Sequence, residues 1–329
     1  MTFSAQTQPS TQTPRRVFII LSAKALPYAE RCVDSLFNNS LEALDVKLIT
    51  DSPEDKQAIV QTVMRLENPQ QHKWQVIDQP EADAQAEEQF HQFEHLKQFR
   101  FGHPCWRKLT DPLLFTRDGE EMIILDPDLY FPNQFAFETT PEKSLLLMWQ
   151  RPSCLLPPES VRAAFSVSKL AHHVDIGVAQ IRKPLDLEWF NWFVGQLGGK
   201  DIPRFMHVEA IVWSAMAMKF GGGYLDPTRW HCWHRTQLKR ILIKLGIPGT
   251  QILKLDNLGA AKCFHACGVS KWWVKEACDK GVLTGINNDL SQPSRVTPFV
   301  EYTRDQYESE QRFKGWLRKL GYYRLFGSN

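Results

Sequence analysis

Short apolar runs alternate with segments of helical spacing through the first half of the chain. The runs at 17–21, 46–50, 74–78, 122–125 and 144–149 are each four to six residues long. Such short, almost wholly apolar runs are typical of buried strands in a parallel sheet. A sixth run, at 174–181, is interrupted by Gly177.

Helical spacing fills the gaps between these runs and dominates the second half of the chain. The segments expected to be helical are 27–38, 53–66, a Glu/Gln-rich stretch ending near Phe93, 185–197, 206–219, 235–245 and 270–280. Strands that alternate with helices predict an α/β domain with a mostly parallel central sheet flanked by helices.

The length, composition and charge of the chain limit what kind of domain this is. The chain has 329 residues, of which 43% are hydrophobic, enough for one large core. Lys and Arg total 39 against 37 acidic residues, so the balance predicts no nucleic-acid partner. The seven cysteines are irregularly spaced, which favours reduced thiols, and no run approaches the ~20 apolar residues of a membrane span. We therefore expect a cytoplasmic protein.

Composition also divides the chain. Residues 1–14 are polar and rich in Thr, Gln and Pro, which predicts a disordered tail. Residues 15–285 hold the alternating pattern and are interpreted as one catalytic domain. Residues 286–329 form an extension that is basic and aromatic at its end.

Ligands of open α/β sheets bind beyond the carboxyl ends of the strands. The residues that follow the apolar runs are therefore the first candidates, namely Ser22, Ala23, Asp51 and the pair Asp126 and Asp128. The pair follows 122–125 directly, and residues two apart in an extended chain point to the same side. Two carboxylates at a strand end suit Mg²⁺ or Mn²⁺ that also holds substrate phosphates. The alternative is that they are ordinary turn aspartates.

A second candidate segment lies at 263–273. His265 offers an imidazole to a metal, and Gly268 lets a ligand approach the backbone. Ser270 is expected to cap a helix whose start would receive a diphosphate, and Lys271 adds a positive charge there. Taken one by one, each of these residues could equally be structural.

The spacing H-x-x-G-x-x-K-x-W at 265–273 resembles the C-terminal signature of family 8 glycosyltransferases, the group of glycogenin and lipopolysaccharide galactosyltransferases. IILDPDLYF resembles that family's metal-binding D-x-D motif. HVDIGVAQI resembles its glycine-containing strand along the donor-sugar pocket, and WRKL at 106–109 resembles its helix with a sugar-binding arginine.

The resemblance implies a GT-A-like fold that binds a nucleotide-diphosphate sugar. It implies that Asp126, Asp128 and His265 hold Mn²⁺ or Mg²⁺, and that Gly268 and Lys271 hold the diphosphate. It further implies donor-sugar contacts from Arg107 and Gly177.

The chain departs from the family pattern in two places. Trp272 stands where the family usually has Pro, and the family's Asp-Gln-Asp cluster is reduced to one acid, Glu209, in 205–209. Glu209 is a candidate to hold or deprotonate the acceptor, with Asp175 as a second candidate. A glutamate in the first turn of a helix is also ordinary capping chemistry. The missing glutamine leaves retention or inversion open.

Three other interpretations compete. A sugar-1-phosphate nucleotidyltransferase normally has a glycine-rich loop after the first strand, and 22–27 contains no glycine. A non-catalytic carbohydrate-binding or scaffold protein would explain the reduced acidic cluster. A structural zinc could draw on 231–234 with Cys263 and Cys267, although finger spacing is absent. The triple glycine at 221–223 lacks the Lys-Ser/Thr of a P-loop and predicts a flexible turn.

The end of the chain combines aromatic and basic residues. RFKGWLRKLGYYRLF at 312–326 has five basic residues and no acid, and 235–245 is a second basic amphipathic segment. Both suit the surface of an anionic membrane, or else they pack on the domain with their charges in water. The sequence as a whole predicts a metal-dependent glycosyltransferase with an unidentified glycan, lipid or protein acceptor, and the two basic segments leave peripheral membrane contact open.

Overall fold

The computed structural model describes residues 13–183, 185–283 and 287–323. Most of the predicted disordered tail 1–14 lies outside these residues, as do 324–326 of the basic-aromatic segment.

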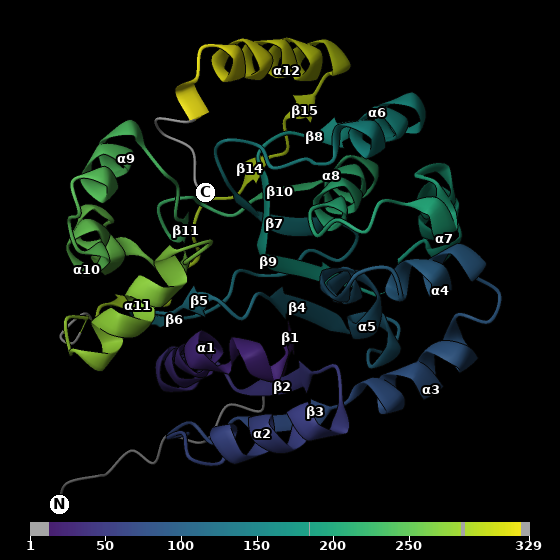
Figure 1. The fold of residues 1–329 in the computed structure, drawn as a ribbon. Helices are drawn as coiled ribbons and strands as arrows, with labels where there is room; N and C mark the ends of the chain where they lie inside the picture. Colours follow the sequence, from purple (N-terminus) through teal and green to yellow (C-terminus); the bar gives the residue numbers. More distant parts are fainter. Residues whose placement is uncertain (1–12, 184, 284–286, 324–329) are drawn as a thin grey trace, which may run out of the picture.

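A mixed eight-stranded sheet forms the centre of the described chain (Figure 1). Its order is β14-β10-β7-β9-β4-β1-β2-β3. The strands are β1 (Arg15–Ile20), β2 (Leu44–Ile49), β3 (Lys73–Ile77), β4 (Glu121–Leu125), β7 (Leu145–Trp149), β9 (Val174–Arg182), β10 (Gly222–Tyr224) and β14 (Thr297–Pro298). The strands β3, β2, β1 and β4 are mutually parallel, and so are β7 and β10. The predicted α/β class with helices flanking a central sheet is confirmed.

Strand β9 runs against both of its neighbours, β4 and β7. The beginning of β9 therefore lies at the same edge as the carboxyl ends of β4 and β7. Leu125 at the end of β4 pairs with Val178, and Trp149 at the end of β7 pairs with Val174. This reversal brings residues 175–177 to the edge where the acidic pair stands.

Helices cover both faces of the sheet. Alternate residues of β1 face opposite sides, since Phe18 and Ile20 lie in one core and Val17 and Ile19 in another. The first core packs under α3 (Gln79–Gln89), α4 (Glu94–Arg100), α5 (Arg107–Leu114), α6 (Pro158–Val167), α7 (Leu187–Gln196) and α8 (Val208–Phe220). The second packs under α1 (Leu26–Asn39) and α2 (Pro53–Val63).

A small sheet beside the main one carries the histidine motif. It has the order β11 (Trp230–Cys232), β12 (Cys263–His265) and β5 (Leu129–Tyr130). Strand β5 follows the acidic pair directly and is antiparallel to β12, with His265 opposite Leu129. Two segments 137 residues apart, 128 and 265, are therefore neighbours through backbone pairing.

The remaining elements are short or peripheral. Two-stranded pairs join β6 (Gln134–Phe135) to β13 (Asp289–Leu290) and β8 (Leu170–Ala171) to β15 (Glu301–Tyr302). The other helices are α9 (Gln237–Lys244), α10 (Gly249–Ile252), α11 (Ser270–Asp279) and α12 (Arg304–Lys319). The 3₁₀ turns are η1 (Ala23–Ala25), η2 (Pro104–Trp106), η3 (Gly199–Asp201), η4 (Leu253–Leu255) and η5 (Leu258–Ala260).

The described part of the extension 286–329 is built into the domain. Strand β14 closes one edge of the central sheet, and the Tyr302 and Tyr307 side chains are buried. None of the helices in the described ranges has both the length and the apolar composition needed to cross a membrane.

The triple glycine is not the predicted flexible turn. Gly222 and Gly223 belong to β10, which pairs with β7 inside the main sheet. Gly222 has φ of +117°, and a Cβ there would lie 1.9 Å from the carbonyl oxygen of Leu145. Glycine is needed at this position because no other side chain fits this close approach.

Candidate metal and phosphate site

The acidic pair is held by backbone hydrogen bonds on two sides. The Asp126 N–H donates to the carbonyl of Gly177 at 2.9 Å, and the Ala266 N–H donates to the carbonyl of Asp128 at 3.0 Å. The first bond ties the pair to β9 and the second ties it to the residue after β12. Asp126 is buried and Asp128 is half-buried. Their carboxylates are therefore fixed at the junction of the two sheets.

His265 completes a cluster with this pair. Its Nε2 lies 3.3 Å from Asp128 Oδ1 and 3.6 Å from Asp126 Oδ2. One ligand atom from each of the three residues lies within 4.8 Å of the others. Two carboxylate oxygens and an imidazole nitrogen form a donor set that suits Mn²⁺ or Mg²⁺.

The other ring nitrogen of His265 contacts Asp175. Nδ1 lies 2.9 Å and 3.0 Å from the two carboxylate oxygens of Asp175. Because an ionised carboxylate only accepts hydrogen bonds, Nδ1 donates to it, and the lone pair of Nε2 can face a cation. The structure therefore places Asp175 behind the imidazole.

Charges in the cluster favour a bound positive charge. Burial works against the charged imidazole, but Asp175 and Asp128 together raise the pKa of His265 well above its usual value. Burial raises the pKa of Asp126. Burial opposes the ionised form of Asp128, yet its contacts with His265 and Lys271 lower its pKa. Without a metal, a proton on the imidazole balances these carboxylates.

Gly177 makes room for the imidazole. A Cβ on Gly177 would lie 2.5 Å from Nδ1, 2.8 Å from Cγ and 3.0 Å from Cε1 of His265. These distances are shorter than any ordinary carbon contact, so only glycine leaves room for the ring at this point of β9. The structure places His265 over the glycine expected to line a sugar pocket.

Lys108 is a buried residue that the sequence analysis passed over. Its Nζ lies 2.5 Å from Asp126 Oδ1 and 3.0 Å from Glu209 Oε1. One ammonium group thus holds two buried carboxylates, one after β4 and one in the first turn of α8. Glu209 Oε2 is buried and makes no hydrogen bond within the described residues. Burial raises the pKa of Glu209 to about 8.

Arg107 points away from the acidic pair. Its Nη1 lies 2.9 Å from Asp51 Oδ1, and its Nε lies 2.8 Å from Asp111 Oδ2. The structure therefore joins Arg107 and Asp51 to each other at the end of β2. Adjacent residues of a helix point about 100° apart, which is why Lys108 rather than its neighbour reaches the cluster.

Lys271 and Gly268 lie beside the pair at the start of α11. Lys271 Nζ is 3.5 Å from Asp128 Oδ2 and 4.5 Å from the centre of the Tyr28 ring. Gly268 has φ of +66° and open space where a Cβ would be. The predicted cap is wrong, since Val269 occupies the N-cap position and the Ser270 hydroxyl donates backward to the carbonyl of Cys267.

The N-cap residue Val269 has no side-chain acceptor for the first backbone N–H groups of α11. Together with Lys271, they form a positively polarised surface next to the acidic cluster.

Ser22 and Ala23 follow β1 at the same edge of the sheet. Ser22 precedes η1, and the Ala23 N–H donates to Asp55 Oδ2 at 2.8 Å. This places both residues beside the carboxyl ends of β2 and β4.

Of the residues suggested for structural zinc, Cys232 and Cys267 lie together and form a group of three possible ligands with His265. His231 contacts Asp256 at 3.0 Å, whereas Cys232 and Cys267 lie beside His265 with their sulfurs 3.9 Å apart. Cys232 Sγ is 4.0 Å from His265 Nδ1, the nitrogen that Asp175 already holds. The hydrogen bond from Cys232 lowers the pKa of Cys267.

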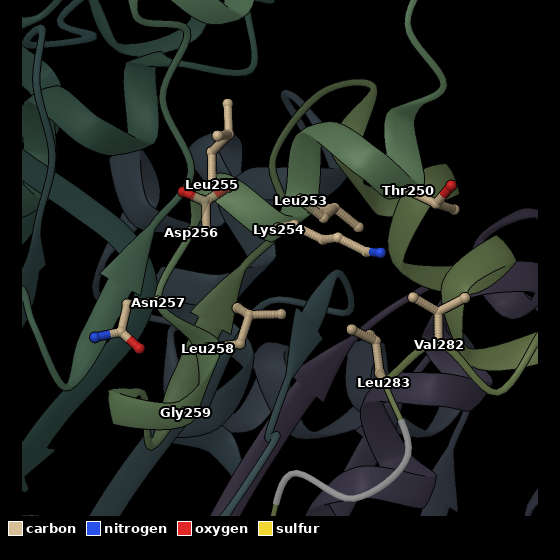
Figure 2. Close-up of a pocket in the computed structure, with 10 residues that line it drawn as sticks. All are labelled: Thr250, Leu253, Lys254, Leu255, Asp256, Asn257, Leu258, Gly259, Val282 and Leu283. Atoms are coloured by element: carbon tan, nitrogen blue, oxygen red, sulfur yellow. The ribbon is translucent and has the colours of Figure 1, made fainter.

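A surface pocket of about 440 Å³ lies beside η4, η5 and the residues that follow α11 (Figure 2). It is lined by Thr250, Leu253, Lys254, Leu255, Asp256, Asn257, Leu258, Gly259, Val282 and Leu283. Asp126, Asp128 and His265 are not among its lining residues.

Comparison with known proteins gives structural likeness only. No protein-family model matches the sequence, and no curated protein matches it. Mouse xyloside xylosyltransferase 1 is similar with a TM-score of 0.45 and 11% identity, over 79% of this chain and 99% of that one. The galactosyltransferase LgtC, solved with donor and acceptor sugar analogues, gives 0.45 and 12% over 82% and 96%.

The glycosyltransferase GlyE of Streptococcus pneumoniae gives a TM-score of 0.47 and 14% identity, over 83% of this chain and 62% of that one. The chain thus spans less than two thirds of GlyE. All three structures are glycosyltransferases, the class that the sequence motifs resemble. Likeness of this degree assigns no activity, substrate or residue role to the chain.

Proposed function

We propose that the chain is a glycosyltransferase with a GT-A-like fold that moves a sugar from a nucleotide-diphosphate donor to an acceptor. The observation that carries the proposal is the meeting of Asp126, Asp128 and His265, with Lys271 and the open start of α11 beside them. A cation site next to a phosphate-sized positive surface is what a diphosphate leaving group requires.

Asp126, Asp128 and His265 would hold Mn²⁺ or Mg²⁺. The donor set fits because Asp175 accepts the Nδ1 proton and leaves Nε2 to face the two carboxylates. A bound divalent cation supplies a Lewis acid that neutralises charge developing on the leaving diphosphate.

The diphosphate would lie between the acidic cluster and α11. Lys271 provides a point charge, and its Nζ is held over the Tyr28 ring rather than free in solvent. Gly268 presents bare backbone, and the α11 N–H groups point outward from an end without a side-chain cap. The nucleotide would lie at the ends of β1 and β2. It would be next to Ser22, Ala23 and Asp51, and Arg107 would hold Asp51 in place.

The acids proposed for the acceptor take different roles. Asp175 is a positioning residue for His265, since both of its oxygens are within 3.0 Å of Nδ1. Glu209 is the remaining candidate for the acceptor hydroxyl. With a pKa of about 8, Glu209 carries a proton at neutral pH and can act as a base only when the pH exceeds about 8. Lys108 would hold Glu209 and Asp126 at a fixed separation.

Two alternatives make different predictions. A scaffold or carbohydrate-binding protein with this fold would show no metal-dependent binding of nucleotide sugars. A sugar-1-phosphate nucleotidyltransferase would release inorganic diphosphate from a nucleoside triphosphate, whereas a transferase releases a nucleoside diphosphate.

Calorimetry with Mn²⁺ and a panel of UDP- and GDP-sugars tests the proposal. We expect Mn²⁺-dependent donor binding that weakens at least about tenfold in Asp128→Asn, because one metal ligand is lost. Asp118→Asn, an exposed carboxylate, is the matched control and should bind as the parent does. Slow donor hydrolysis in the same panel would identify base and sugar. Equal binding with and without Mn²⁺ would refute metal dependence.

We also propose that the protein is cytoplasmic and meets an anionic membrane through α9 and α12. Phe313, Trp316 and Leu320 are each more than half exposed, and the i, i+3, i+7 spacing puts them on one stripe. Leu238, Ile241 and Leu245 form a similar exposed stripe on α9. Gln237 Nε2 on α9 donates to the hydroxyl of Tyr322, just beyond the end of α12, at 2.5 Å.

Basic residues accompany both stripes, as an anionic surface requires. They are Arg235, Arg240, Lys244, Arg312, Lys314, Arg318 and Lys319.

Sedimentation with vesicles tests this surface. Binding to phosphatidylserine-containing vesicles should exceed binding to pure phosphatidylcholine. It should fall roughly tenfold or more in the variant Phe313→Ser with Trp316→Ser, since two aromatic anchors are lost. Trp192→Ser, an exposed aromatic on α7, is the control that should leave binding unchanged. A double variant that sediments as the parent does would overturn the membrane proposal.

A further inference from the structure

Two cysteines from separate segments lie with their sulfurs 3.9 Å apart. Cys232 is the last residue of β11, and Cys267 stands two residues beyond the end of β12. The two strands are parallel neighbours in which Cys232 pairs with His265. The backbone ladder therefore sets the two thiols side by side.

The surroundings of the two thiols differ. Cys232 is 6% exposed at the end of a buried strand, whereas Cys267 is half-buried and is followed by the exposed Gly268. Cys267 Sγ also donates to the carbonyl of Trp233 at 3.1 Å. Cys267 is therefore the more accessible of the two thiols, and the Cys232 sulfur lies 3.9 Å from its own sulfur.

A metal is the competing explanation for two neighbouring thiols. Within the described residues, the third ligand near both sulfurs is His265, and its Nδ1 is held by Asp175 at 2.9 Å. Two thiols without a free third ligand make an incomplete zinc site. Chemistry between the two sulfurs fits the contacts better.

We propose that Cys232 and Cys267 form a reversible disulfide when the protein meets a small-molecule disulfide such as oxidised glutathione. The Cys267 thiolate attacks one sulfur of the reagent and displaces one glutathione thiolate, which leaves a mixed disulfide on Cys267. The Cys232 thiolate then attacks the Cys267 sulfur and displaces the second glutathione thiolate. The two protons pass to the departing thiolates, so the protein loses two electrons and the glutathione disulfide gains them.

The disulfide would act on the neighbouring site. An S–S bond is about 2.05 Å long, so the sulfurs must approach by roughly 1.9 Å. Cys232 belongs to a buried strand and Cys267 to the loop between His265 and Gly268, so most of the movement falls on the loop. If the proposed metal site is right, oxidation therefore weakens Mn²⁺ binding at His265.

Peptide mapping of the full chain tests the disulfide without reference to function. The reduced protein is incubated with oxidised glutathione, alkylated, digested and analysed by mass spectrometry. We expect two of the seven thiols to disappear and one peptide pair to be linked through Cys232 and Cys267, reversibly on addition of a thiol reductant. Unlinked cysteines, or a glutathione adduct that persists on Cys267, would overturn the proposal.

Variants sharpen the assignment. Cys154→Ser is the matched control, because Cys154 is, like Cys267, a half-buried free thiol. It should leave the link intact, whereas Cys232→Ser should stop at the mixed disulfide on Cys267. A link between Cys154 and Cys267 would contradict the proposed pair. Because replacing buried Cys232 can impair folding, the peptide map of the unaltered sequence is decisive by itself.

A Mn²⁺ titration of the reduced and oxidised protein tests the coupling. At least tenfold weaker binding after oxidation is expected. Unchanged binding in a linked protein would overturn the coupling alone. If the reduced protein binds no Mn²⁺, the proposed function fails, and the mass data still decide the disulfide.

Discussion

Replacing Gly177 by alanine puts a methyl group against the proposed metal-binding histidine. The new Cβ would lie 2.5 Å from His265 Nδ1, whereas ordinary contacts begin near 3.4 Å, so the ring must withdraw by about 0.9 Å. That nitrogen is the one bonded to Asp175 at 2.9 Å. A shift of this size misaligns the bond, because the carboxylate belongs to the same rigid strand as the glycine.

The expected cost follows from the bond that is disturbed. A hydrogen bond to a charged group contributes about 1.5–3 kcal/mol. Loss of a hydrogen-bonded partner behind a metal-binding histidine typically weakens metal affinity about 10–100-fold. We therefore expect Gly177→Ala to lower the melting temperature and to weaken Mn²⁺ binding within that range.

Calorimetric Mn²⁺ titration and thermal unfolding measure these two effects. Gly315→Ala is the control, because a Cβ at this α12 position meets nothing within 4 Å. It should preserve Mn²⁺ affinity and leave the melting temperature equal or higher. If Gly177→Ala bound Mn²⁺ as the parent does and melted at the same temperature, the packing of His265 on β9 would not hold the ligand in place.

Three other substitutions probe the buried charges and the sheet. Lys108→Met leaves Asp126 and Glu209 without their ammonium group and should cost about 3–5 kcal/mol in urea unfolding. A Lys108→Met protein within about 1 kcal/mol of the parent would contradict the ion-pair argument. Glu209 has a folded pKa of about 8 against an ordinary 4.5, so the folded state keeps a proton that the unfolded state releases. Parent stability relative to Glu209→Gln should therefore fall as pH rises from 4.5 to 8, and parallel stability–pH curves would refute the raised pKa. In Gly222→Ala the new Cβ would lie 1.9 Å from the carbonyl oxygen of Leu145, and alanine would have to adopt φ of +117°. We therefore expect the free energy of unfolding in urea to fall by roughly 2 kcal/mol or more. Unchanged stability would mean that β10 is not packed as described.

Local patterns in the sequence predicted most of the elements. The apolar run 122–125 is β4 (Glu121–Leu125), 174–181 is β9 (Val174–Arg182), and the helix expected at 270–280 is α11 (Ser270–Asp279). A strand or helix with a buried face has apolar residues at a regular spacing along the sequence. These elements can therefore be predicted from a short window of sequence.

The direction of β9 and the place of the triple glycine required the tertiary structure. An apolar run looks the same whether its neighbours run parallel or antiparallel, so the sequence could not show that 175–177 return to the edge of the acidic pair. Likewise, Gly222 is a strand residue only because the β7 backbone passes close to it. Contacts between segments that are distant in the sequence produce no repeating pattern of apolar residues, so they cannot be predicted from a local window.

The composition of the site divides in the same way. The resemblance of the motifs around Asp126, Asp128 and His265 to those of family 8 glycosyltransferases implied a shared metal ion, and one ligand atom from each residue lies within 4.8 Å of the others. The sequence did not show that Lys108 rather than Arg107 reaches the cluster, since this depends on the orientation of α5. It also did not show that Asp175 lies behind the imidazole, because hydrogen-bond partners are chosen by position in space and not by separation along the chain.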